Sequence, residues 1–169
     1  MKLIPRQHLI LAAVLATALN ITGCASTQVA NAPVTLSATI AADQELSTFN
    51  KLAQDSGLAA QLGATGPVTI FAPSDAAFKA MPADALSKLS KDPEALKSLL
   101  NFHIVQGVIK STDITGSSTK ETLQGAKISI SKAGDFVTVE DAMVTSADKV
   151  ATNGVIHVID TVLTPPKKK

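Results

Sequence analysis

The first half of the chain carries apolar residues at the spacing of helices. Between Asp43 and about residue 62, the apolar positions Leu46, Phe49, Leu52 and Ala53 recur three and four residues apart. That spacing places them on one face of a helix. This region is therefore predicted to be helical, with one face packed against a core.

Local signals then predict a strand and three helix starts. The short β-rich run Val68–Phe71 follows Gly66-Pro67 and predicts a strand. Ser74 has the side chain of a helix N-cap, and Pro82 ends that helix so that a second one starts near residue 83. Asp92-Pro93-Glu94 combines a capping carboxylate, a proline suited to the first helical position and an acid at the positive end of the helix dipole.

In the second half the hydrophobic period changes from helical spacing to two. Ile128 and Ile130 alternate with serines, and strands are predicted near residues 127–131, 136–139 and 143–150. Residues 155–163 are almost continuously apolar, which predicts a strand buried on both faces. The polar stretch 111–125 is expected to be a surface loop. Helices followed by an antiparallel sheet predict the α+β class.

The N-terminal segment has the pattern of an export signal. Lys2 and Arg6 form a basic leader, and Leu9–Leu19 is an apolar run that is short for a membrane span. The run ends in Ile21-Thr22-Gly23-Cys24, and Cys24 is the only cysteine. This segment resembles a bacterial lipoprotein signal, which implies cleavage before Cys24 and acylation of that residue. The alternative is an ordinary secretory signal with a coincidental cysteine.

The lipoprotein resemblance defines the start of the mature chain. The sequence is then divided into a signal peptide at 1–23, a lipidated Cys24 with a flexible tether at 24–35, a domain at 36–165 and a basic tail at 166–169. Membrane lipid is then the partner of the acylated Cys24, and the protein is exported to the cell envelope. By the same resemblance, Ala25 favours the outer membrane if the host has one, with the domain facing either the periplasm or the surface.

Composition excludes several classes of ligand. Acidic and basic residues are nearly balanced and interspersed, so nucleic acid is not an expected partner. Arg6 is the only arginine, and the mature chain lacks the usual side chain for bidentate phosphate recognition. Trp and Tyr are absent and there are five Phe, which argues against an aromatic platform for sugars.

Three stretches resemble the fasciclin-like domain family in the right order and spacing. They are Thr69–Phe78, with the sequence TIFAPSDAAF, then Asn101–Val105 (NFHIV), and Asn153–Asp160 (NGVIHVID). The residues that carry the family motifs are Phe71, Pro73, Ser74, Asp75, Phe78, Phe102, His103, Asn153, Gly154, His157 and Asp160. Judged from its residues alone, the first stretch is predicted to form a strand–turn–helix corner. In the last stretch, Gly154 permits a tight turn into a buried strand. Most of these positions are therefore expected to determine the fold.

Membership implies a β-sandwich-like wedge of antiparallel strands with several packed helices, a role in adhesion and no cofactor. Phe102 departs from the pattern, because many relatives have Tyr at this position and its hydroxyl is lost here. The integrin-binding role linked to the Tyr-His neighbourhood in animal relatives is therefore not carried over to Phe102-His103.

Candidate chemistry is sparse. His103 and His157 could pair with Asp75 or Asp160 in a catalytic or metal site, but no nucleophile elbow or His-x-x-x-His pair accompanies them. Buried structural histidines are the simpler interpretation, and no metal ligands are assigned. The acidic residues Glu140-Asp141 and Asp148 lack the ligand spacing of an EF-hand loop.

Three functions remain open at this stage. The first is a membrane-anchored, extracytoplasmic adhesion or interaction module without catalysis, whose ligand would be an envelope or extracellular protein or polysaccharide. Its expected contact surfaces are the 111–125 loop and the neighbourhood of Phe102 and Ile104. The second is a periplasmic protein that binds a small ligand or glycan in an apolar pocket. The third is an enzyme, which would have to rely on His103, His157 and nearby carboxylates.

Overall fold

The computed structural model describes residues 34–64 and 66–166, except for the side chains of residues 63 and 64. The described residues all belong to a unit that runs from residue 31 to the C-terminus. The predicted signal peptide, Cys24, Ala25, the tether up to residue 33 and the lysines at 167–169 lie outside the described residues.

Helices dominate the chain up to residue 102. They are α1 (Leu36–Ala42), the 3-10 helix η1 (Gln44–Leu46), α2 (Ser47–Asp55), α3 (Leu58–Ala64), α4 (Asp75–Ala80), α5 (Ala83–Lys91) and α6 (Pro93–Phe102). The predicted helix starts are confirmed. The Ser74 side chain accepts a bond from the Ala77 N–H at 3.2 Å, and Asp92 accepts from Glu94 and Ala95 at 3.1 and 3.0 Å.

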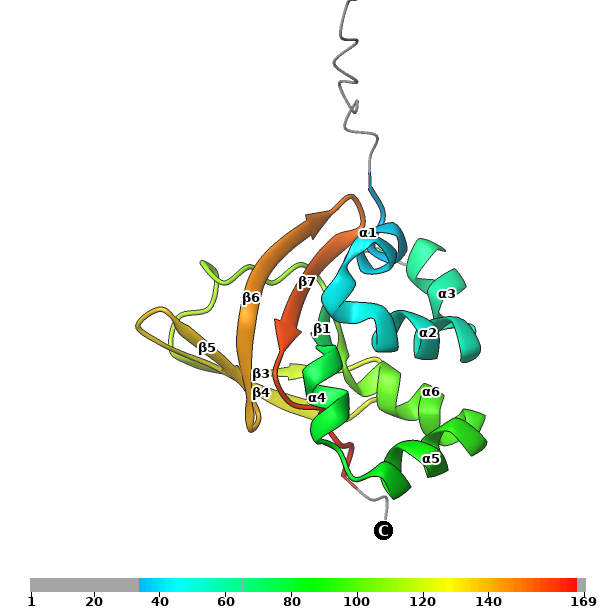
Figure 1. The fold of residues 1–169 in the computed structure, drawn as a ribbon. Coiled ribbons are helices and arrows are strands. Elements are labelled where there is room, and N and C mark those ends of the chain that lie inside the picture. Colours follow the sequence, from blue (N-terminus) through cyan, green and yellow to red (C-terminus); the bar gives the residue numbers. More distant parts are fainter. Residues whose placement is uncertain (1–33, 65, 167–169) are drawn as a thin grey trace, which may run out of the picture. The chain divides into compact units, whose positions relative to one another are not determined.

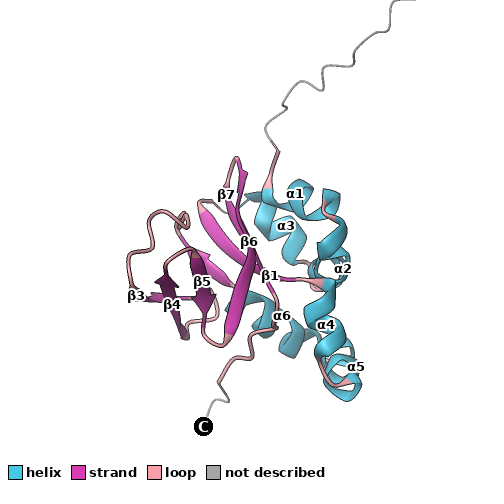
Figure 2. Cartoon of the chain, turned by 60° about the vertical axis from the view of Figure 1, so that its left-hand side comes forward, coloured by secondary structure: helices cyan, strands magenta, loops and turns pink. Residues whose placement is uncertain are grey.

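The strands form one seven-stranded sheet in the order β2-β1-β7-β6-β5-β4-β3. Their bounds are β1 (Val68–Pro73), β2 (Ile104–Gln106), β3 (Ser117–Glu121), β4 (Lys127–Ala133), β5 (Phe136–Val139), β6 (Ala142–Ala151) and β7 (Gly154–Ile159). The sheet curls so far that Thr122, just after β3, forms a bridge with Val105 in β2. Helices α1 to α5 gather on one side of the sheet (Figures 1 and 2). The predicted α+β class is confirmed.

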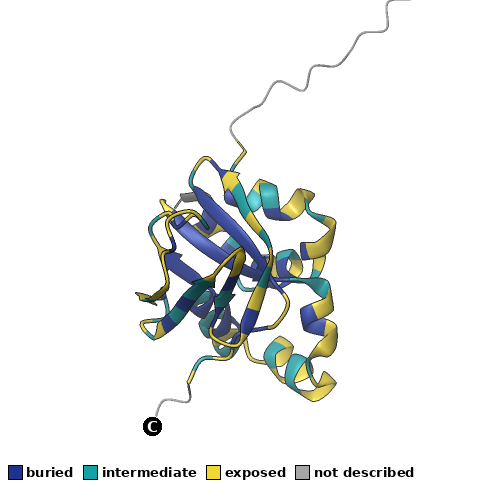
Figure 3. Ribbon diagram, turned by 90° about the vertical axis from the view of Figure 1, so that its left-hand side faces the viewer, coloured by how far each residue is buried: buried dark blue, intermediate teal, exposed yellow. Residues whose placement is uncertain are grey.

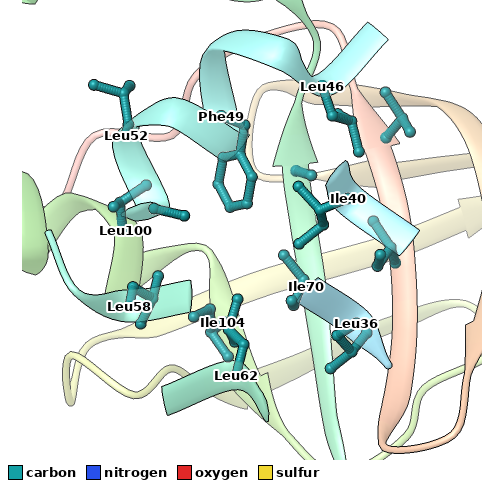
Figure 4. Packing of buried hydrophobic residues seen from close by; sticks show 14 of the residues in the cluster. Leu36, Ile40, Leu46, Phe49, Leu52, Leu58, Leu62, Ile70, Leu100 and Ile104 are labelled. Atoms are coloured by element: carbon teal, nitrogen blue, oxygen red, sulfur yellow. The ribbon is translucent and has the colours of Figure 1, made fainter. Parts of the chain in front are cut away.

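Strands β1 and β7 separate two hydrophobic cores. Every residue of both strands is buried, which confirms for β7 the prediction of a strand buried on both faces. On one face, Ile70 and Ile156 join the helix core, toward which Leu36, Ile40 and Phe49 point in Figure 4. On the other face, Phe71 and Ile159 join a second core inside the curl of the sheet. Figure 3 shows buried residues along the central strands and exposed residues on the outer sides of the helices.

The structure adds one helix that was not predicted and corrects two expectations. Helix α1 was not predicted, because Leu36 and Ile40 are its only buried residues and one turn of spacing gives no period. The expected surface loop 111–125 contains β3, whose residues are all polar and which pairs with β4 as an outer strand. The sheet is not antiparallel throughout, because β1 and β7 run parallel, with Val68 opposite Gly154 and Pro73 opposite Ile159.

Candidate functional site at the junction of the three motifs

His103 links the end of α6 to the C-terminal segment. Its ring is completely buried, and Nδ1 donates to the Leu99 carbonyl at 2.8 Å while Nε2 accepts from the Leu163 N–H at 3.0 Å. With Nδ1 protonated and Nε2 unprotonated, the neutral ring therefore has a hydrogen-bond partner at each nitrogen. Burial lowers the pKa of His103 to about 4, although the bond to the Leu99 carbonyl acts in the opposite direction. The ring is therefore neutral at physiological pH.

His157 lies on β7 against the motif phenylalanine of β1. The rings of Phe71 and His157 stack with centroids 5.4 Å apart and planes 20° apart. Nε2 donates to the Ile109 carbonyl at 2.8 Å, and Nδ1 accepts from the Asp148 N–H at 3.3 Å. Burial lowers the pKa of His157, against the opposing effects of the Ile109 carbonyl and the Asp148 charge. The expected burial of both histidines is confirmed.

Asn153 and Gly154 join the sheet to the helices at the β6–β7 turn. The Asn153 side chain accepts from the Leu36 N–H at 2.9 Å and donates to the Leu62 carbonyl, so one amide holds both α1 and α3. Gly154 passes so close to β1 that an added Cβ would lie 2.0 Å from the Val68 carbonyl oxygen. A side chain cannot be accommodated in that space.

Asp75 and Asp160 bind backbone and hydroxyl groups of neighbouring elements. Asp75 accepts from Thr48 N–H at 2.8 Å and from the Ser47 hydroxyl at 2.5 Å, and it therefore caps α2 from a distant part of the chain. Burial alone would raise the pKa of Asp75, but the bonds from Ser47 and Thr48 hold it below its ordinary value. Asp160 accepts from the Met143 N–H at 2.8 Å and from the Thr161 hydroxyl at 3.1 Å.

The cap supplied by Asp75 gives a first prediction. Asp75→Ala leaves the first turn of α2 without its acceptor, and we expect a loss of about 1–2 kcal/mol in the free energy of unfolding. The matched control is Asp84→Ala, which removes an exposed acid from the first turn of α5 and should cost less than about 0.5 kcal/mol. Urea denaturation followed by far-UV circular dichroism measures both. Equal losses in the two variants would contradict the assigned cap.

The remaining motif residues are apolar and buried. Phe78 and Phe102 are 3% and 4% exposed, and Phe102 packs into the core inside the curl of the sheet. Pro73 ends β1 opposite Ile159, where the next residue, Ser74, donates its N–H to the Ile159 carbonyl at 3.0 Å. The three motifs thus meet along β1 and β7, with the Phe71 N–H also bonded to the His103 carbonyl at 2.8 Å.

The described residues do not bring the two histidines together with Asp75 or Asp160. Within residues 34–64 and 66–166, no group of three His, Cys, Asp or Glu side chains is placed to hold a metal ion. Neither histidine ring bonds to Asp75 or Asp160; the rings contact backbone groups instead.

The acidic residues of β6 and its turn also have local partners. Asp148 accepts from both the N–H and the hydroxyl of Ser111, and Glu140 accepts from the Ser129 N–H at 2.6 Å. Asp148 has a positive φ of 57° beside a β-bulge of β6. Its place beside His157 could not be predicted, since nothing in the local sequence indicates a bulge.

The motifs and the fold together define the class of protein. The family model for the fasciclin domain matches residues 44–165, and this chain belongs to the fasciclin domain family. Transforming growth factor-beta-induced protein ig-h3 from Sus scrofa is 39% identical over 115 residues, which cover 68% of this chain and 17% of that protein. The cell surface glycolipoprotein MPB83 of Mycobacterium bovis is 37% identical over 101 residues, or 60% of this chain and 45% of MPB83.

The fold also matches a solved structure. A pair of FAS1 domains from the insect cell adhesion molecule fasciclin I superimposes with a TM-score of 0.58 at 25% identity, covering 70% of this chain and 45% of the pair. The chain spans less than half the length of each of these three proteins. Among the described helices, none is both long and apolar enough to cross a membrane.

Proposed function

We propose that this protein is an exported, lipid-anchored adhesion or interaction module of the cell envelope, without catalytic activity. Two similar proteins support the proposal by their names, one a cell surface glycolipoprotein and the other a cell adhesion molecule. The ligand is an envelope or extracellular protein or polysaccharide, and recognition takes place on the exterior of the domain.

One observation supports a function without catalysis. The polar side chains of the motifs are bonded to backbone or hydroxyl groups of neighbouring elements: both histidines in the core, Asn153 at the turn and Asp75 at α2. Groups committed in this way hold elements together and are not free to take a proton from a substrate. We therefore assign the motif residues a mainly structural role.

The anchor is proposed from the sequence alone. Lipidation of Cys24 follows from the leader, the apolar run and the terminal Gly-Cys, and Ala25 favours the outer membrane where the host has one. Two or three acyl chains give stable membrane anchoring, since each buried methylene contributes about 0.8 kcal/mol.

A small-ligand function is the second candidate, and its binding site would be a hollow beside Phe102. This hollow of about 390 Å³ lies beside Phe102 and is lined by Lys127, Glu140 and Asp141 together with the C-terminal segment 161–164 and Pro166. Other hollows of about 370 and 550 Å³ occur elsewhere on the described surface, so size does not single this one out. A dedicated ligand pocket usually stands out among its neighbours.

A comparison of the full-length chain with a truncated variant, residues 25–169, tests the proposal, because the truncation removes the apolar leader and Cys24 together. We expect the full-length protein to fractionate with membranes and to carry acyl chains on its N-terminal peptide, while the truncated variant stays in the soluble fraction. The soluble variant should then bind saturably to washed cells or purified envelope polymers, and free polymer should compete. A folded variant that binds no surface would refute adhesion and favour the small-ligand candidate. A parent protein without acyl chains would refute the anchor.

A further inference from the structure

Exposed apolar side chains concentrate at one end of the sheet. In the described part of the chain, the large hydrophobic residues with high exposure are Val34, Val108, Phe136, Met143 and Val150. Val34, Val108 and Val150 belong to segments that are joined by backbone hydrogen bonds at this end. The Thr152 N–H binds the Val34 carbonyl at 2.9 Å, the Val68 N–H binds Asn153 at 3.2 Å, and the Gly107 N–H binds Pro67 at 2.8 Å.

We call this surface the valine end. It comprises residues 34–35, 66–67, 106–108 and 150–154, and it lies where the β6–β7 turn meets the start of α1 (Figure 1). None of these residues is charged. Among the charged residues that flank these segments, Lys149 forms an ion pair with Asp43, and Lys110 and Asp148 also lie within two residues of them. Beside them an open hollow of about 550 Å³ is lined by Val34, Ala42 and Val150 together with the polar residues Thr39, Asp43 and Gln44.

The position of Val34 shows how close an anchor at Cys24 would hold a membrane to the valine end. Val34 is the first described residue, so the preceding chain joins the domain at the valine end. Cys24 is ten residues earlier, and ten residues reach at most about 36 Å when extended and roughly 18 Å as a relaxed coil. An acylated Cys24 would thus hold a bilayer within one domain diameter of the three valines.

We propose that the valine end docks on the lipid surface that holds the acyl chains. This inference rests on the proposed lipidation of Cys24. Small apolar side chains without charges can enter the headgroup boundary, about 5–10 Å deep. Three valines bind a membrane too weakly on their own. The tether, however, makes docking intramolecular and supplies a high effective concentration of lipid.

Docking fixes which surface is presented to a partner. Parallel pairing of β1 and β7 puts Val68 and Gly154 at the valine end and Pro73 and Ile159 at the other. The latter end, with the C-terminal segment and the hollow beside Phe102, then faces away from the lipid. The anchor and the fold together orient the domain.

Fluorescence quenching in vesicles tests the orientation. Acylation blocks Cys24, so a cysteine introduced into the full-length protein is its only free thiol. Val150→Cys and Phe136→Cys form a matched pair, because Val150 and Phe136 are 64% and 65% exposed in the parent structure. Each is labelled with an environment-sensitive dye and reconstituted into phosphatidylcholine vesicles that contain a nitroxide lipid. We expect at least about threefold stronger quenching and a blue-shifted emission at position 150, and Val108→Cys should follow position 150.

Each alternative result has a separate meaning. Equal quenching at positions 150 and 136, with acylated Cys24 verified by mass spectrometry, overturns docking while the anchor stands. Absence of the acyl chains overturns both the anchor and the docking that rests on it. If the dye at position 150 shows blue-shifted emission in detergent without vesicles, and the protein has the mass of a dimer, a second copy of the chain covers the valine end. This result also overturns lipid docking.

Discussion

Replacement of Gly154 by alanine should be among the most damaging single substitutions in this domain. The new Cβ would lie 2.0 Å from the Val68 carbonyl oxygen and 2.9 Å from Leu36 Cδ1. The oxygen is part of the backbone of β1, so β7 and β1 must separate at the start of their parallel pairing. We expect Gly154→Ala to lower the free energy of unfolding by at least about 3 kcal/mol, a large share of the stability of a typical domain.

The matched control for Gly154→Ala is Gly66→Ala, at the same end of the sheet. There an added Cβ would meet Asn153 Cβ at 3.6 Å, which is ordinary van der Waals contact. Chemical denaturation of both proteins, with the slope of unfolding free energy against urea as a check on cooperativity, separates the two cases. A Gly154→Ala protein with parental stability would show that the close approach of β7 to β1 is not required.

Local signals in the sequence predicted most of the elements. Ser74 and Asp92 mark helix starts because a capping side chain acts within three residues of its own position. The alternation at Ile128 and Ile130 and the continuous run after Gly154 reflect burial on one face and on two. These features depend on neighbours along the chain and can be read from it.

The features that could not be predicted depend on distant partners. Asp75 caps a helix that begins 28 residues earlier, at Ser47. The parallel pairing of β1 and β7 brings together strands that are far apart in sequence. Strand β3 has no apolar residue to indicate it and is fixed only by its pairing with β4. Asn153 belongs to a family motif, but only the structure shows that its side chain joins two helices to the sheet.

Stability should fall as the pH decreases from about 6.5 to about 4, because of the buried histidines. In the unfolded chain His103 takes up a proton near pH 6.5. In the folded domain it stays neutral until about pH 4. The unfolded state therefore binds more protons in this window, and acid favours it. The contribution of His103 is present in full above about pH 6.5 and falls by about 3 kcal/mol across the window.

Other groups act in the same direction. The pKa of His157 is lowered as well, chiefly by burial. The aspartates 43, 75 and 148 also have lowered pKa values, because hydrogen bonds outweigh the effect of burial. The stability they contribute is present above their unfolded pKa, near 4, and is lost only at lower pH. Histidine and carboxylate effects are therefore separated on the pH axis.

A glutamine at position 103 isolates the histidine effect. The side chain of His103→Gln can still donate to the Leu99 carbonyl and accept from the Leu163 N–H, but it does not titrate. Denaturant unfolding between pH 7.5 and 4.5 should show a steep loss for the parent protein and a clearly smaller one for the variant. The companion variant His157→Gln should still show the share of the stability loss that His103 causes. If the stability of His103→Gln depended on pH as steeply as that of the parent protein, other groups would take up the protons. The neutral His103 ring with its two hydrogen bonds would then not be the source of the acid sensitivity.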